Sequence, residues 1–427
     1  MSQLRGTTSP LVSPFVSSDT DTSYYHLDDT DHDVINRYLS TLVERALSQL
    51  ELSYCIEMAE DNHGVTATTL GRIASYYYLH HTSVKMFRDD LSPSCTIPDV
   101  IQVLAMAHEY NELPVRHNED HVNSELAKQL PLPVDSHSYD SSNTKAHLLL
   151  QAHFCQQQLP SSDYHTDTKS VLDQAIRILQ AMLDVSADQG WLVTSLHVIH
   201  LIQMVVQGRW LGDNSLLCLP HVQPHHLSCF IVPGSRRRLP LDCLPELMHA
   251  VDRQPQIHDV LVHLPVINVS LNLKGWWETT EGQQETRHVP HNISDGGRPR
   301  DDQWMPVHAD QEYVLSIDLH RVNKVKSRNT QAHSPRFTKP KDEGWILVLG
   351  EVDSREVIAV KRVGYRRGQS SVQLAFYTPE TVGRVIYTLY LMSDCYLGLD
   401  QQYDVCLNVV EASLETQVNS ELLNESN

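Results

Sequence analysis

The sequence predicts a multidomain protein that is helical in its first half and β-structured in its second: an all-α helical bundle, a small helical linker module, and a β-sandwich. Three observations support this fold class. Apolar residues recur at helical spacing through the first half, and the apolar period changes to two from Val266 onward. A proline-containing break over 220–234 separates the two patterns. With 427 residues, the chain is long enough for about three domains.

The first predicted helix runs from Asp31 to Leu50, where apolar residues recur every three or four positions. Thr30 and Asp33 provide a capping signal at its start. The preceding residues 1–24 are rich in Ser and Thr and lack apolar periodicity, so they are predicted to be a disordered leader.

The bundle is predicted to cover residues 69–220. Its helices are expected where an apolar periodic segment is closed by proline or glycine, at 69–79, 97–110, 118–129, 144–158, 166–188 and 189–208. The most apolar stretch, 191–210, contains two histidines and two glutamines, which indicates a packed helix rather than a membrane span. A linker module is predicted over 221–262, with a short helix at 241–251.

The β-sandwich is predicted over residues 263–415, followed by a disordered tail over 416–427. Seven short strands at regular spacing, separated by Gly and Pro turns, are typical of this architecture. In the strand over 385–392, Tyr387, Leu389 and Leu391 alternate with Thr388, Tyr390 and Met392, so one of these two sets is expected to face the core.

Charge is unevenly distributed along the chain. Lys and Arg number 33 and Asp and Glu number 53, for a formal net charge of −20, which excludes a broadly cationic protein of the histone type. Residues 321–368 nevertheless carry twelve basic and five acidic residues. This stretch is either a solvated surface or a contact surface for phosphates or for an acidic protein.

No motif of self-contained enzymatic chemistry is present in the sequence. It has no Gly-Lys dipeptide and therefore no P-loop of the usual form. Ser142 and Lys145 match a Ser-x-x-Lys pattern in a context that indicates a helix start, and His117 and His121 lack a third metal ligand. We therefore expect no catalytic residue, no metal and no cofactor in this chain. The eight cysteines include no Cys-x-x-Cys pair and are expected to be free thiols.

Four segments, in order, carry a resemblance to a known family. They are 69–78, 113–120, 144–153 and 393–404. Together they resemble the C-terminal Brl unit, also named for its relative in the Sec translocon, of dual-cassette Ski-type RNA and DNA helicases. The likeness covers about residues 24–415. Within the family, the segments most resemble the large helicase subunit of the activating signal cointegrator complex.

The resemblance implies a fold and a limit on activity. It implies that 25–68 is a remnant of a winged helix, that 221–262 is a truncated helix-loop-helix module, and that the sandwich is fibronectin-III-like or Ig-like. In this family the RecA-like domains hydrolyse ATP, and this sequence lacks them. The resemblance therefore implies a part of an ATP-dependent helicase that is not an enzyme alone.

The resemblance also implies where nucleic acid would touch the chain. The family's ratchet helix, which contacts the threaded strand, corresponds to residues 173–181. Arg177 occupies the family's basic position, and Gln180 stands where active cassettes often have a second Arg. Gln174, Arg177 and Gln180 share one helix face by spacing. Five further expected phosphate contacts are Arg236, Arg237, Arg238, Arg366 and Arg367.

Three functional hypotheses follow. The first is an accessory module that guides single-stranded DNA or RNA and binds other subunits of the activating signal cointegrator complex. It has no contact with membranes and is found in the nucleus and cytoplasm. The family's roles are alkylation-damage DNA repair, ribosome quality control and transcription coactivation. The alternative is a protein-interaction scaffold without nucleic-acid contact, which the net charge of −20 favours. The third hypothesis is a free-standing enzyme, and only the Ser142–Lys145 and His117–His121 matches support it.

Overall fold

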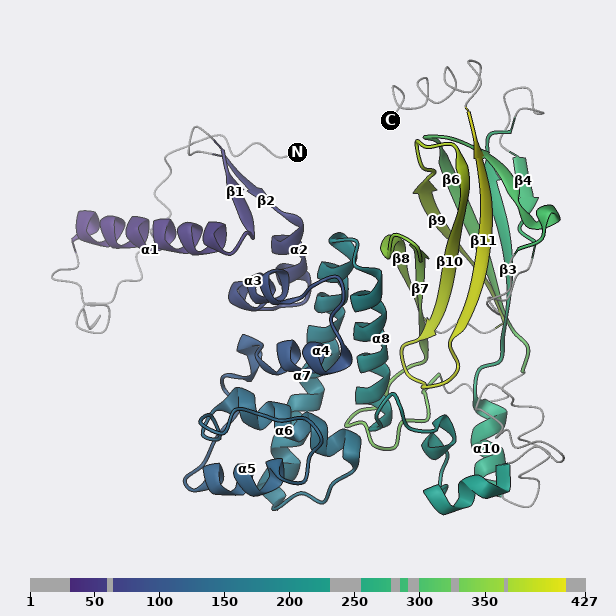
Figure 1. Ribbon diagram of the computed structural model, residues 1–427. Helices are drawn as coiled ribbons and strands as arrows, with labels where there is room; N and C mark the ends of the chain where they lie inside the picture. Colours follow the sequence, from purple (N-terminus) through teal and green to yellow (C-terminus); the bar gives the residue numbers. More distant parts are fainter. Residues whose placement is uncertain are drawn as a thin grey trace. The chain divides into compact units, whose positions relative to one another are not determined.

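In the computed structural model helices predominate before residue 264, interrupted by one two-stranded sheet, and strands predominate after it (Figure 1). The structure describes residues 31–59, 64–230, 255–277, 285–290, 299–323, 330–364 and 368–411. Two compact units are distinguished, Met1–Gly71 and Arg72–Asn427. The expected combination of helices with sheets is confirmed. The predicted leader 1–24, the tail 416–427 and the predicted helix 241–251 lie outside the described residues.

The first unit contains a long helix and a two-stranded hairpin. Helix α1 spans His32–Leu52, and the antiparallel strands β1 and β2 span Ile56–Met58 and Val65–Ala67. Gly71 lies so close to this hairpin that a Cβ atom there would be 2.0 Å from the carbonyl oxygen of Cys55. The interpretation of 25–68 as a winged-helix remnant stays a prediction.

The helices of the second unit largely follow the apolar pattern. They are α2 (Thr69–Tyr76, which crosses the unit boundary), α3 (His81–Asp90), α4 (Ile97–Ala105), α5 (Glu119–Ala127), α6 (Ser142–Cys155), α7 (Ser162–Asp188) and α8 (Leu192–Gln207). The helix predicted over 97–110 is shorter than expected, because α4 ends at Ala105 and the 3-10 turn η2 (His108–Tyr110) follows. Helix α7 begins four residues earlier than expected, where the Ser161 side chain accepts a hydrogen bond from the Tyr164 N–H.

Shorter helical segments connect α8 to the sheets. They are η3 (Ser215–Cys218), η4 (Pro224–Phe230) and α10 (Pro255–His263), and much of the predicted linker module between η4 and α10 lies outside the described residues. Among the described helices, none combines the length and the apolarity needed to cross a bilayer.

Two sheets follow. The five-stranded sheet has the order β5 (Met305–His308), β11 (Gln401–Val410), β10 (Gly383–Ser393), β7 (Gly344–Glu351) and β8 (Glu356–Gly364). The four-stranded sheet has the order β4 (Glu285–His288), β3 (Ile267–Gly275), β6 (Glu312–Arg321) and β9 (Gln369–Tyr377). The pairing is antiparallel except between β11 and β5. A short 3-10 turn, η5 (Asp301–Gln303), precedes β5.

One hydrophobic core joins the two sheets. Leu389 on β10 pairs in register with Leu349 on β7, and Leu315 on β6 pairs with Leu273 on β3. All four side chains are fully buried in the same cluster. Of the two alternating sets on β10, the one that contains Leu389 therefore faces this core. The closer assignment to a fibronectin-III-like or Ig-like sandwich stays a prediction.

The helices pack on the outer face of the five-stranded sheet. Helix α8 contacts β7, and α7 contacts β8. Gly350 on β7 has no side chain at the point where the two layers meet, and a Cβ atom there would lie 2.6 Å from Cδ1 of Leu192 on α8. Strand β7 is consequently buried on both faces, which explains its unbroken apolar sequence.

Candidate functional site

The candidate site is the half-exposed face of α7 that carries Gln174, Arg177 and Gln180. The opposite face of the helix is fully buried and includes Ala175, Ile178 and Leu179. This amphipathic division places the three predicted polar side chains at the edge of the helical layer, where each is half-buried.

Arg177 is held by the segment that follows α2. Its Nη1 group donates to the backbone carbonyls of Tyr77, at 2.7 Å, and of Tyr78. Its Nη2 group donates to the side-chain oxygen of Gln174. Tyr78 has a positive φ of 51°, so the chain turns sharply there and directs its carbonyls toward the guanidinium. Arg177 is thus fixed in one position, with part of its donor capacity already used.

Gln180 lies in a different environment from the other two residues. It lines a cavity of about 490 Å³ between α7 and the strands β7 and β8. Its backbone carbonyl accepts a hydrogen bond of 3.1 Å from Arg362. The structure therefore brings Gln174 and Arg177 into direct contact, whereas the contact of Gln180 is with Arg362.

The other predicted contact residues lie beyond what the structure describes. Residues 236–238 fall in the gap between η4 and α10, and Arg366 and Arg367 fall in the gap between β8 and β9. Their role stays a prediction.

One feature of this face was not predicted from the sequence. The carboxylate of Asp184 on α7 accepts the Tyr77 hydroxyl at 2.7 Å on one oxygen and Arg362 at 2.6 Å on the other. Burial, followed by the hydrogen bond to Asp184, raises the pKa of Tyr77, so the phenol stays protonated and acts as the donor. The Asp184 carboxylate therefore links helix α7 to the segment after α2 and to strand β8.

A buried ion cluster fixes α7 against α6 and α5. Lys145 has no exposed side-chain surface, and its ammonium lies 2.6 Å from Glu119 and 2.7 Å from Asp167. Arg116 reaches the same two carboxylates at 3.0 and 2.7 Å. Burial alone would raise the pKa of both acids, but the contacts with the two cations lower it overall. Both carboxylates are therefore ionised, and the nearby cations balance their charge. Three of its four members come from the segments 113–120 and 144–153.

The segment 393–404 joins the sheets to α8. The Gln203 amide donates to the Ser393 carbonyl at 2.7 Å and to the carboxylate of Asp400 at 2.9 Å. Gln207 donates in the same way to the Cys395 carbonyl at 2.7 Å. Burial raises the pKa of Asp400 to about 6. The motif residues in this segment thus hold the helical layer and the sheet layer together.

The chain is similar to a known domain family and to larger proteins. A family model described as the Sec63 Brl domain matches residues 67–406. Activating signal cointegrator 1 complex subunit 3 of Homo sapiens is 52% identical over 94% of this chain and 19% of that protein. The DExH-box ATP-dependent RNA helicase DExH14 of Arabidopsis thaliana is 37% identical over 90% of this chain and 16% of its own length.

A more distant relative is the U5 small nuclear ribonucleoprotein 200 kDa helicase of Mus musculus, 31% identical over 92% of this chain and 17% of that protein. The chain spans between about a sixth and a fifth of the length of these curated relatives.

Proposed function

Because this chain belongs to the Sec63 Brl domain family, we propose that it acts as a non-catalytic accessory module of an ATP-dependent nucleic-acid helicase. In this proposal it guides single-stranded DNA or RNA and binds other subunits of the activating signal cointegrator complex. The similarity to two proteins named as helicases, and to a protein named as a subunit of the activating signal cointegrator 1 complex, supports the proposal. Roles in alkylation-damage DNA repair, ribosome quality control and transcription coactivation, in the nucleus and cytoplasm, stay predictions.

The main observation in favour of nucleic-acid guiding is that the Arg177 side chain is held in a fixed position by its hydrogen bonds. A guanidinium has five N–H donors, and three of those of Arg177 are directed at Tyr77, Tyr78 and Gln174. The remaining donors belong to a half-exposed side chain. Because the side chain is already ordered, a phosphate that contacts it would cost little additional rotamer entropy.

The same contacts favour a second candidate, a protein-interaction scaffold without nucleic-acid contact. If Arg177 serves only to hold the segment after α2 in place, its hydrogen bonds explain why an arginine is needed there, and no contact with nucleic acid is required. The formal charge of −20 also repels phosphates over distances comparable to the screening length.

Titration of a labelled single strand at two salt concentrations distinguishes the candidates. We compare the chain with Arg177→Ala, with Arg177→Lys, and with the double variant Arg366→Ala and Arg367→Ala. Guiding by α7 predicts that Arg177→Ala weakens binding by about 1–3 kcal/mol. It also predicts that the plot of the logarithm of the binding constant against the logarithm of salt concentration becomes shallower by about 0.7. The reason is that the variant makes one phosphate contact fewer and therefore releases fewer counterions on binding. Arg177→Lys should keep that slope.

The control for this experiment is Arg88→Ala, which removes a cation from α3 that pairs with Asp89 at 3.5 Å. Circular dichroism establishes that each variant is folded. An equal loss in Arg88→Ala would indicate general electrostatics, and undetectable binding at low salt would leave the scaffold as the function of this chain.

The non-catalytic part of the proposal has its own test. The absence of a Gly-Lys dipeptide from the sequence supports it. The purified chain should release no phosphate from ATP above a blank without protein. Release that is stimulated by nucleic acid and abolished by a chelator of Mg²⁺ would contradict it.

A further inference from the structure

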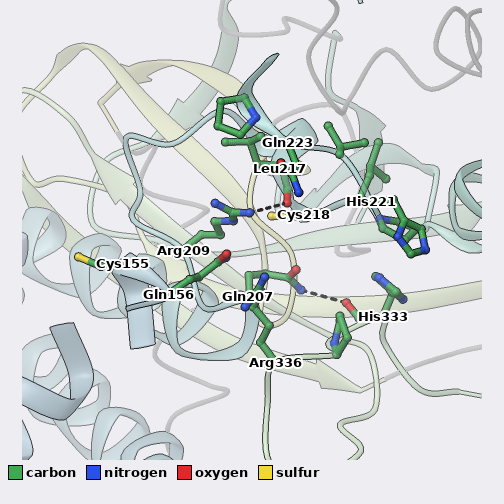
Figure 2. A pocket seen from close by; sticks show the side chains of 15 residues that line it. Cys155, Gln156, Gln207, Arg209, Leu217, Cys218, His221, Gln223, His333 and Arg336 are labelled. Atoms are coloured by element: carbon green, nitrogen blue, oxygen red, sulfur yellow. Dashed lines mark hydrogen bonds between the residues drawn. The ribbon is translucent and has the colours of Figure 1, made fainter. Parts of the chain in front are cut away.

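A cavity of about 710 Å³ lies where α6 and α8 end (Figure 2). Its walls come from the last residues of these helices, from η3 and the chain up to Pro224, and from the loop 333–336 before β7. The volume is within the range of pockets that hold small molecules. Figure 2 shows Arg209, Cys218 and Arg336 among its lining side chains.

A second cavity of about 480 Å³ adjoins the first. The two share Gln156, Pro335 and Arg336 in their walls, and the second adds His165 and Lys169. Neither lining contains an aspartate or a glutamate, although 53 of the 427 residues of the chain are acidic. The two cavities are therefore a locally cationic region of an acidic protein.

Arg209 lines the first cavity, and its guanidinium has a buried donor without an acceptor. Its Nη2 group donates to the Leu217 carbonyl at 3.1 Å, whereas its Nε atom is buried and meets no acceptor in the described part of the chain. A buried donor without an acceptor is destabilising, so the guanidinium gains from an anion that accepts its hydrogen bonds.

Arg336 supplies the second charge. It is exposed, and its methylene groups pack against Gly208, where a Cβ atom would be 3.0 Å from Cδ of the arginine. Within the described residues, neither Arg336 nor Arg209 forms an ion pair with a carboxylate. Partial desolvation of the guanidinium, followed by the neighbouring charge of Arg209, lowers the pKa of Arg336, so the two cations lie close enough to repel each other.

Other groups near the arginines do not neutralise them. Burial raises the pKa of Cys218 to about 11, so its thiol is uncharged at neutral pH. Burial lowers the pKa of His333, which keeps that ring neutral as well. Asp213 is close enough to influence Cys218 but is exposed, lies outside the lining, and accepts the Trp210 N–H at 3.3 Å.

We propose that the two cavities form one binding site for a small compound that carries two or more phosphate groups. Arg209 and Arg336 bind one phosphate in the larger cavity, and Lys169 binds another in the smaller. A phosphate matches this set because its oxygens accept several charge-assisted hydrogen bonds from guanidinium donors. The inference is independent of the proposed function and uses none of the α7 residues assigned to it.

The test is calorimetric titration of the whole chain with inorganic tripolyphosphate. The variants are Arg209→Gln and Arg336→Gln, with Arg88→Gln on α3 as the matched control. We expect binding by the unaltered chain, an affinity at least tenfold lower in each of the first two variants, and no change in the control. Because Arg336 is exposed, its variant should fold even if Arg209→Gln does not, and circular dichroism verifies this.

A competition arm identifies the source of the phosphate. If a single-stranded oligonucleotide displaces tripolyphosphate and depends on the same two arginines, the site belongs to nucleic acid and the small-compound assignment is overturned. Absence of tripolyphosphate binding, or an equal loss in Arg88→Gln, overturns the site altogether.

Discussion

The ammonium of Lys145 and the carboxylate of Asp167 form an ion pair of 2.7 Å in which the lysine side chain is fully buried. Lys145 comes from α6 and Asp167 from the first turns of α7. Because each charge would be costly in an apolar interior alone, the contact makes the packing of these two helices depend on both residues.

Replacement of Lys145 by Met should therefore be strongly destabilising. The change leaves Glu119 and Asp167 with only Arg116 as a cation, and we expect a loss of about 3–5 kcal/mol in the free energy of unfolding. Denaturant unfolding measures it. Lys128→Met removes a solvent-exposed pair with Glu125 and should cost less than about 1 kcal/mol. Similar losses in the two variants would contradict the prediction.

Gly350→Ala should loosen the junction of α8 with β7. The added methyl group would overlap Leu192, so we expect a loss of about 1–3 kcal/mol. Gly364→Ala on β8 is the matched control, since no atom lies within 4 Å of its Cβ position. Leu192→Ala in the Gly350→Ala background should recover part of the loss in a double-mutant cycle. Strict additivity would show that the two positions do not meet.

Asp400 should make stability fall as pH rises from about 4 to about 6. Burial raises its folded pKa to about 6, so in this window the folded state binds a proton that the unfolded state has lost. Asp400→Asn cannot titrate. The unfolding free energy of the wild type, relative to this variant, should therefore decrease by on the order of 2 kcal/mol across the window.

A neighbouring histidine requires a control for that measurement. His200 lies 3.8 Å from Asp400, and burial lowers its pKa to about 4, which produces a slope of the opposite sign. Repeating the comparison in a His200→Gln background removes that contribution. A flat difference between the two proteins in both backgrounds would refute the role of Asp400.

Leu389→Ala should cost about 2–5 kcal/mol, because the side chain is fully buried between the two sheets and the substitution leaves a cavity. Thermal or denaturant unfolding measures the loss. Val382→Ala, at a position that is 57% exposed, should stay within about 0.5 kcal/mol. A loss at Leu389 as small as that at Val382 would place the leucine outside the core.

Local periodicity predicted most of the helices and strands, but it did not predict the hydrogen-bond partners of their polar side chains. The apolar repeat in 192–207 is strong enough to predict α8. The partners of Gln203, in contrast, lie 190 and 197 residues away, in Ser393 and Asp400, and no spacing rule reaches that far. Helix α3 was missed because only Ser83, Val84 and Phe87 of it are buried, which is too few for a clear repeat.

The candidate site shows the same limit. Helical spacing correctly places Gln174 and Arg177 side by side, since that is a property of one helix. That the guanidinium is engaged by the carbonyls of Tyr77 and Tyr78 depends on a contact across about 100 residues. The two-cavity site is still less visible in the sequence, because its arginines are 127 positions apart and follow no motif.

The Asp184 carboxylate, which binds both Tyr77 and Arg362, affects how expression fragments of this chain should be designed. Tyr77 lies 107 residues before Asp184, and Arg362 lies 178 residues after it. A fragment that ends near residue 220 would keep the first hydrogen bond and lose the second, and it would also expose the surface of α8 that now covers β7. An expression fragment limited to the helical half would therefore expose an apolar helix surface, so a fragment should include both layers and begin before α2, as Thr69–Val410 does.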